Sequence, residues 1–238
     1  MDMRQDEPGL LSQHAQVLFD TDTDGRLVGV NEPDGEAPPR LFVARGRAAV
    51  RMWCRSDLGP AAIERCLSLQ PKLPLWDGND TSSVWYGALR SALGTDAPVA
   101  DDERGPAFRF LPAATAQDAS SEAVLVDESS AELLERFFPR TRAMLASRAP
   151  IAGVVRDGVV VSACYSARKR PFACEAGVAT AESFRGLGLA TAAVRAWRRA
   201  VEGAGAMPFY STTWDNGASL RIASKLGLVA YADTVSLA

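Results

Sequence analysis

The residues best suited to chemistry in this 238-residue chain form a glycine-rich run, Arg-Gly-Leu-Gly-Leu-Ala, at positions 185–190. The run follows a strand-like segment at 176–180 and leads into a helix-forming segment at 190–202. Glycine lets the backbone approach a ligand closely, and the first-turn amides of a helix have no partner within the helix. Together with the positive end of the helix dipole, those amides can hold an anion. The run therefore predicts a cradle for a phosphate or a pyrophosphate.

Other interpretations of this run compete with one another. A Walker loop needs a lysine after its last glycine, and none follows here. A dinucleotide-binding fingerprint needs Gly-x-Gly-x-x-Gly early in a βαβ unit, whereas this run has a poorer spacing and lies late in the chain. The remaining alternative is a glycine turn that only lets strand and helix pack closely.

The residues on both sides of the run resemble one superfamily. Residues 175–185 read Glu-Ala-Gly-Val-Ala-Thr-Ala-Glu-Ser-Phe-Arg, and residues 216–228 combine Asn-x-x-Ser, an apolar helix and Lys-Leu-Gly-Leu. With Arg-x-x-Gly-x-Ala between them, these motifs resemble the GCN5-related N-acetyltransferase (GNAT) superfamily in order and spacing. The resemblance implies an α/β GNAT fold in the C-terminal half, a mixed, mostly antiparallel sheet flanked by helices, with an additional, divergent N-terminal α+β region.

The resemblance also implies acetyl-CoA, or another acyl-CoA, as co-substrate, and no metal. The strand before the run would pair through its backbone with the pantetheine arm, and the run would hold the pyrophosphate. Polar residues of the downstream motif would contact the pantetheine or its acyl end. The implied cofactor-binding residues are Val178, Thr180, Arg185, Gly186, Leu187, Gly188, Leu189, Ala190, Thr191, Asn216 and Ser219.

The implied reaction is direct acetyl transfer to a primary amine, in which a base takes the amine proton and a backbone N–H holds the oxyanion. Glu175 is the candidate base because it is ionisable within an apolar strand; an ion-paired strand residue is the alternative. The tyrosine that protonates the CoA thiolate in many relatives corresponds to Ala223 here, and Tyr231 is a candidate to replace it. The alternative function is a non-catalytic acyl-CoA-binding sensor or interaction module.

Composition limits the partners. The formal net charge of −3 gives no strong field for nucleic acid or membrane surfaces. No apolar run is long enough to span a bilayer, and the acidic start lacks a signal-peptide core, so we expect a cytoplasmic protein. The acceptor is expected to be a small-molecule or peptide amine, and the sequence leaves monomer and homodimer open.

Cysteine and histidine offer little further chemistry. The four cysteines form no Cys-x-x-Cys pair and lie in apolar or mixed runs, which predicts core packing. The single histidine, His14, falls in an N-terminal segment that we expect to be frayed, and one histidine excludes a His-rich metal site.

The elements that must position these residues divide into two predicted domains, an α+β region at 1–106 that would shape the acceptor site and an acyltransferase domain at 107–238. The first contains predicted hairpins at 17–30 and 40–53, a helix at 58–69 capped by Asp57, a helix at 82–93 and a linker at 94–106. The second contains a helix at 131–147 capped by Ser129 or Ser130, a hairpin over Asp157-Gly158, and the strands and helices around the glycine-rich run.

Overall fold

The computed structural model of the chain describes residues 7–33, 35–78, 84–111 and 122–238. They form two compact units: the first runs to Phe108 and includes Ser211–Gly217 and Ala230–Ala238, and the second comprises Arg109–Tyr210 and Ala218–Val229. The sequence predicts one boundary at residue 106, whereas in the structure two short C-terminal segments belong to the first unit. The last segment joins the first unit because strand β11 (Val229–Leu237) pairs antiparallel with strand β3 (Leu41–Gly46).

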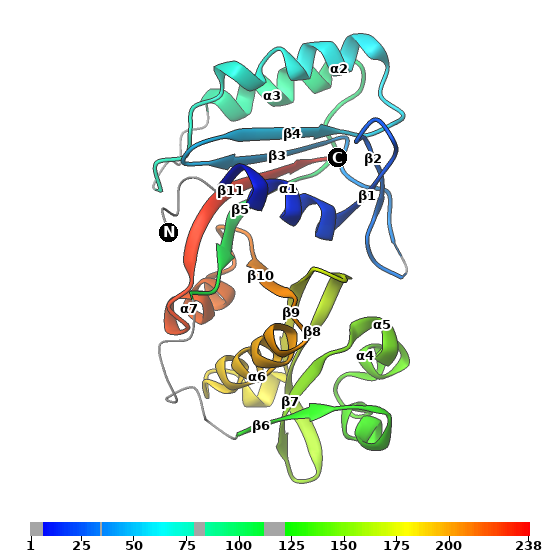
Figure 1. Cartoon of the computed structure of the whole chain (residues 1–238), viewed down its shortest axis with the longest axis vertical. Helices are drawn as coiled ribbons and strands as arrows, with labels where there is room; N and C mark the ends of the chain where they lie inside the picture. The colour runs from blue at the N-terminus through cyan, green and yellow to red at the C-terminus, as the bar shows by residue number, and fades with distance from the viewer. Residues whose placement is uncertain (1–6, 34, 79–83, 112–121) are drawn as a thin grey trace. The chain divides into compact units, whose positions relative to one another are not determined.

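The first unit is built on four neighbouring strands in the order β4–β3–β11–β5, beside a two-stranded hairpin of β1 and β2. Helices α2 and α3 pack over one face, where an apolar core includes Leu41, Val43, Leu89 and Val235 (Figure 1). The remaining elements are α1 (Glu7–Leu18), β1 (Phe19–Thr21), β2 (Leu27–Val30), β4 (Val50–Cys54), α2 (Pro60–Leu67), η1 (Gln70–Lys72), α3 (Val84–Gly94) and β5 (Asp102–Arg109).

Charged side chains from three neighbouring strands lie beside the apolar residues of this core. Asp233 of β11 lies opposite Arg45 of β3, and both residues are fully buried. The Asp233 carboxylate accepts hydrogen bonds from Arg104 at 2.9 to 3.2 Å and from the Trp214 indole at 2.9 Å. The guanidinium carbons of Arg45 and Arg104 lie 3.9 and 4.8 Å from the centroid of the Trp85 ring. The three strands are therefore joined by ionic and cation–π contacts as well as by backbone pairing.

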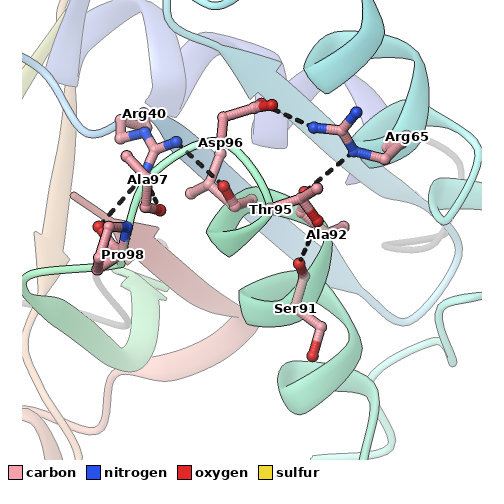
Figure 2. A network of polar contacts seen from close by, with 9 residues as sticks. Arg40, Arg65, Ser91, Ala92, Thr95, Asp96, Ala97 and Pro98 are labelled. Atoms are coloured by element: carbon pink, nitrogen blue, oxygen red, sulfur yellow. Dashed lines mark hydrogen bonds and ion pairs between the residues drawn. The ribbon is translucent and has the colours of Figure 1, made fainter.

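Two arginines hold the C-terminal end of α3, where backbone carbonyls lack helical partners (Figure 2). Arg40, which is buried, donates to the carbonyls of Leu93 at 3.1 Å and Ala97 at 2.9 Å. Arg65 of α2 donates to the Ala92 carbonyl at 3.3 Å and pairs with Asp96 at 2.7 Å. Positive charge at a helix C-terminus also complements the helix dipole, so these contacts fix α3 against its neighbours.

The second unit contains the strand order β10–β9–β8–β7–β6. All neighbouring pairs are antiparallel except β9 and β10, which are parallel. Its elements are β6 (Ala123–Val126), η3 (Glu128–Leu134), α4 (Pro139–Ala143), α5 (Leu145–Arg148), β7 (Ile151–Arg156), β8 (Val159–Arg170), β9 (Ala173–Thr180), η4 (Glu182–Phe184), α6 (Leu189–Gly203), β10 (Met207–Ser211) and α7 (Gly217–Lys225).

The α6 helix packs on this sheet through a buried stripe that includes Val194 and Trp197, and the Trp197 indole donates to Ser166 of β8 at 3.1 Å (Figure 1). A second apolar cluster joins the sheet to the segment from η3 to α5 through Leu134, Phe138 and Ile151. Long α6 follows the glycine-rich run directly, so its N-terminus is presented at the end of β9.

Most predicted elements are confirmed, and the exceptions have local causes. The predicted helix at 131–147 is broken into η3, α4 and α5, because Pro139 can begin a helix but cannot continue one. Its cap is Asp127, which accepts from the Ser129 amide at 3.0 Å, rather than Ser129 or Ser130. Asp57 does not cap α2; it pairs with Arg55 at 2.7 Å, and α2 begins at Pro60 after Gly59.

Two further predictions about the N-terminal half were wrong. The segment containing His14 is helix α1, and His14 is 2% exposed rather than frayed. The predicted linker at 94–106 contains the start of strand β5. The start of α3, predicted near Ser82, lies outside the described residues.

Candidate functional site

The glycine-rich run forms a turn that only glycine adopts without strain. Gly186 and Gly188 both have φ of +81°, and Gly188 is the N-cap of α6. A Cβ at either position would meet no atom within 4 Å, so backbone conformation rather than crowding selects glycine there. Leu187 between them is 66% exposed, whereas Leu189 is buried and anchors the first turn of α6. The turn thus exposes its backbone to solvent.

The amides of this turn are available to a ligand. The Thr191 amide bonds to the Gly188 carbonyl at 3.1 Å, but within the described chain the amides of residues 186–190 make no backbone hydrogen bond outside the helix. They lie at the positive end of a helix of 15 residues. Arg185 is exposed beside them, and its Nε donates to the Thr180 carbonyl at 3.4 Å. The arrangement can hold a phosphate or pyrophosphate through backbone N–H groups.

Strand β9 loses its neighbour on one edge before it reaches this turn. It pairs with β10 only at three positions, ending with Phe209 opposite Glu175. On its other edge β9 stays paired with β8 as far as Thr180. The five residues from Ala176 to Thr180 therefore have one edge unpaired by β10, in the direction of the glycine-rich turn.

The register shows which backbone groups face that edge. The Ala181 amide bonds to the Val161 carbonyl at 2.9 Å, and residues alternate between bonded and non-bonded pairs along an antiparallel ladder. Counting back, Ala179 and Gly177 bond to β8, while Ala176, Val178 and Thr180 direct their N–H and C=O groups to the open edge. Val178 and Thr180 are the two residues that the sequence predicted to pair with an extended ligand. Their geometry suits an added strand.

Glu175 lies where the two parallel strands separate. Its side chain is 4% exposed, and it is paired in register with Arg168 of β8 as well as with Phe209 of β10. Its charge acts on two buried neighbours, Cys164 and Tyr210, whose pKa values it raises in addition to the larger effect of burial. The only predicted base thus lies at the start of the open edge, beside a phenol and a thiol.

Tyr231, the predicted acid, lies in the first unit. Its hydroxyl is 2.7 Å from Nδ1 of His14, and the two rings meet edge to face with centroids 6.0 Å apart. Both side chains are buried. This contact gives the phenol a structural partner from helix α1, which the sequence could not indicate because the two residues lie at opposite ends of the chain.

The downstream motif surrounds the beginning of α7. Asn216 precedes the helix and is exposed, and its amide bonds to the Thr213 carbonyl at 3.2 Å. Ser219 lies in the first turn, where its carbonyl accepts a hydrogen bond from the Tyr210 hydroxyl at 3.4 Å. Ala223 is 1% exposed and offers no ionisable group. Tyr210, which sequence reasoning did not single out, lies on β10, with five residues between it and the start of this motif at Asn216.

The four cysteines are buried, as predicted, and burial keeps their thiols protonated. It raises the pKa of Cys54 to about 11, that of Cys164 well above its usual value, and those of Cys66 and Cys174 to a smaller extent. Since the thiolate is the nucleophile, none of them suits a covalent acyl-enzyme. Within the described residues there is also no group of three or more His, Cys, Asp or Glu that could hold a metal.

We therefore expect the folded protein to resist thiol reagents. A thiol whose pKa is raised gains its thiolate only as the pH approaches that higher value, so at pH 8 about one Cys54 thiol in a thousand is ionised. Ellman's reagent at pH 8 should label none of the four cysteines within minutes, and all four in denaturant. Rapid labelling of a thiol in the native protein would contradict this expectation, and a cysteine would again be a candidate for a covalent acyl-enzyme intermediate.

The helices among the described residues all fall short of the length and apolar character that crossing a membrane requires.

Comparisons with known proteins match one family model and several solved structures. A family model described as GNAT acetyltransferase matches residues 123–233. A GCN5-related N-acetyltransferase-like protein from Streptococcus suis has a TM-score of 0.50 at 17% identity, covering 98% of this chain and 100% of that one. A GNAT-family acetyltransferase from Colwellia psychrerythraea gives 0.49 at 14%, covering 100% and 97%. A GNAT-family protein from Novosphingobium aromaticivorans gives 0.48 at 19%, covering 58% of this chain and 65% of that one.

No curated protein sequence matches the chain. The likeness to the Streptococcus suis protein is one of fold, and it confirms the predicted mixed, mostly antiparallel sheet flanked by helices.

Proposed function

We propose that the protein is an N-acyltransferase that uses an acyl-CoA, most simply acetyl-CoA, and transfers its acyl group directly to a primary amine, because residues 123–233 match the GNAT acetyltransferase family model. The observation that carries this proposal is the open edge of β9 between Glu175 and Thr180, which leads straight to the glycine-rich turn. We further propose a cytoplasmic location and a small-molecule or peptide amine as acceptor.

The cofactor would extend along this edge. The pyrophosphate would accept hydrogen bonds from the amides of residues 186–190, and the pantetheine arm would pair with the backbone of Val178 and Thr180. The reactive end would then lie near the point where β9 and β10 separate. There the Ala176 N–H is the first on the open edge, and it would donate to the oxyanion that forms on the thioester carbonyl.

Glu175 would act as the base, directly or through one water. In the step we propose, the amine nitrogen attacks the thioester carbon, its proton passes to the Glu175 carboxylate, and the carbon–sulfur bond breaks with its electron pair on sulfur. Because no cysteine offers a thiolate, the acyl group would pass to the amine without a covalent enzyme intermediate. Asn216 and Ser219 flank the start of α7 and would contact the pantetheine or its acyl end.

The test is CoA binding followed by turnover. We expect calorimetry to show binding of CoA, and a panel of primary amines with acetyl-CoA to release free thiol. Glu175→Gln should lower kcat by about 10² to 10⁴-fold while leaving CoA affinity unchanged, the range typical of a lost general base. The matched control is Glu182→Gln, an exposed carboxylate in η4 beside the same turn, which should behave like the wild type.

Two outcomes would overturn parts of this proposal. Absence of CoA binding would contradict the assigned cofactor. Tight CoA binding without turnover on any amine would instead favour a non-catalytic acyl-CoA-binding module, in which case Glu175→Gln would have no kinetic effect to measure.

A further inference from the structure

Arg148, the last residue of the short helix α5, is a buried cation among neutral groups. Its side chain belongs to a residue that is 9% exposed. One terminal nitrogen donates to the hydroxyl of the buried Thr141 at 3.1 Å, and the guanidinium carbon lies 4.5 Å from the centroid of the Tyr165 ring. Among the residues that the structure describes, no carboxylate forms an ion pair with Arg148. A buried charge is costly without a counter-ion, so this cation is suited to an anion that comes from a ligand.

The guanidinium group of Arg148 retains N–H groups for such a ligand. It has five N–H donors, of which the Thr141 hydroxyl accepts one. None of its nitrogens is both fully buried and without a hydrogen-bond partner, so the donors that do not bond to a described residue are open to solvent. The hydroxyl and the aromatic ring fix the plane of the guanidinium and leave the other donors for a planar anion.

The segment that ends at Arg148 carries only positive charge. Residues 136–148 include four arginines and no aspartate or glutamate. Lys169 of β8 adds a further positive charge beside α5, because its Nζ donates to the carbonyls of Ala146 and Ala149 at 2.8 and 3.2 Å. Charge of one sign favours ligands of the opposite sign, so this part of the second unit favours an anionic ligand.

The proposed base, Glu175, faces the same side of the sheet as this segment. Ser166 of β8 accepts a hydrogen bond from Trp197 of α6, so Ser166 and its cross-strand partner Ala176 face α6. Side chains alternate between the two faces along a strand, so Glu175 points to the opposite face. Tyr165 also points there, because it packs into the apolar cluster that joins the sheet to the segment from η3 to α5.

Gly177 brings the Tyr165 ring close to the base. Tyr165 lies opposite Gly177, and a Cβ at this glycine would lie only 2.5 Å from a ring atom, so a larger residue would displace the ring. Gly177 and Glu175 are two residues apart on one face of β9, a step of about 7 Å. Arg148 contacts the same ring. A ligand anion held by Arg148 and an amine beside Glu175 are therefore close enough to belong to one small molecule.

We propose that Arg148 binds a carboxylate of the acceptor, so that the acceptor is an amine that also carries a carboxylate, such as an amino acid. The inference rests on the proposed function, because it requires Glu175 to take the proton of the acceptor amine. The planar fork of arginine matches the two oxygens of a carboxylate. The bound carboxylate supplies the counter-ion that Arg148 lacks among the described residues, and it directs the amine at the other end of the acceptor toward Glu175.

The experiment compares kcat/KM for α- and ω-amino acids with kcat/KM for their carboxamides, with acetyl-CoA as donor and release of free thiol as readout. We expect the wild type to prefer each accepted acid over its amide by about ten- to a hundredfold, the range for a hydrogen bond to a charged group. Arg148→Gln should remove this preference by raising KM for the acids, with KM for the amides and the dissociation constant for CoA unchanged. Arg148→Lys, which keeps the charge without the fork, should retain part of the preference.

Arg156→Gln is the matched control. It removes the same charge from the same unit, but Arg156 is 42% exposed and pairs with Glu122, so this variant should keep the wild-type preference. If Arg148→Gln lowers kcat/KM for acids and amides alike, Arg148 is only structural and the inference is overturned. Should that variant not fold, the wild type decides: equal kcat/KM for acids and amides overturns the inference while the proposed function stands. Absence of turnover with every amine contradicts the proposed function itself, and the inference fails with it.

Discussion

Replacing Gly188 with alanine is expected to raise the dissociation constant for CoA by about ten- to a hundredfold. Gly188 holds φ of +81°, a conformation that costs a residue with a Cβ about 1–2 kcal/mol. The turn can escape that strain only by rotating its backbone, and the amides of the first turn of α6 then point away from the position that we propose for the pyrophosphate. Each hydrogen bond to a charged group that is lost costs about 1.5–3 kcal/mol, and 1.4 kcal/mol corresponds to a factor of ten.

The measurement is calorimetric titration with CoA, and Gly203→Ala is its control. Gly203 ends the same helix, and a Cβ there would also meet nothing within 4 Å, but its φ is not positive. We expect Gly203→Ala to bind CoA like the wild type. Wild-type affinity in Gly188→Ala would mean that the turn does not hold the pyrophosphate, whatever the activity of the protein.

Replacing Asp233 with asparagine is expected to lower the free energy of unfolding by about 3–5 kcal/mol, the usual cost of removing one partner from a buried ion pair. Asp233 is fully buried and accepts from Arg104 and Trp214, and it lies opposite Arg45 in the sheet. The variant leaves two guanidinium groups against Trp85 with no carboxylate at this position. For a domain of ordinary stability, about 5–15 kcal/mol, such a loss is large.

Asp102→Asn is the matched control for this prediction. Asp102 forms an ion pair with Arg90 in the same unit, but both side chains are 38% exposed. Pairs screened by solvent contribute about 1 kcal/mol or less, so this variant should unfold in urea close to the wild type. Equal unfolding midpoints for the two variants would show that the charged side chains of the three strands do not stabilise the first unit.

The local parts of the fold were predictable because their causes lie within a few residues. Asp157-Gly158 predicts its hairpin, and the structure gives both residues positive φ, as such a turn requires. Pro139 shows the limit of the same reasoning. The composition of residues 131–147 favours one continuous helix, but the chain is interrupted after η3 and a new helix, α4, begins at Pro139. Asp127 was missed as a cap because Ser129 and Ser130 nearby are equally good candidates by type.

The candidate site was predictable only in part. Val178, Thr180 and the glycine-rich run were assigned from a motif, and the geometry of these residues is consistent with the proposed roles. The place where many relatives carry a tyrosine is occupied by the buried Ala223, and the predicted substitute, Tyr231, lies in the first unit against His14. The sequence could not predict that contact, because it joins residues from opposite ends of the chain.

The sequence by itself determined the glycine-rich turn, the helix that follows it and the resemblance of its motifs to the GNAT superfamily. Each depends on short-range conformational preferences or on ordered motifs along one stretch of chain. Only the tertiary structure decided that β9 and β10 separate after Glu175, that Tyr231 contacts His14, and that the buried Asp233 forms an ion pair with Arg104. These features join residues far apart in the chain. Strand register and packing set such contacts, and no local pattern records them.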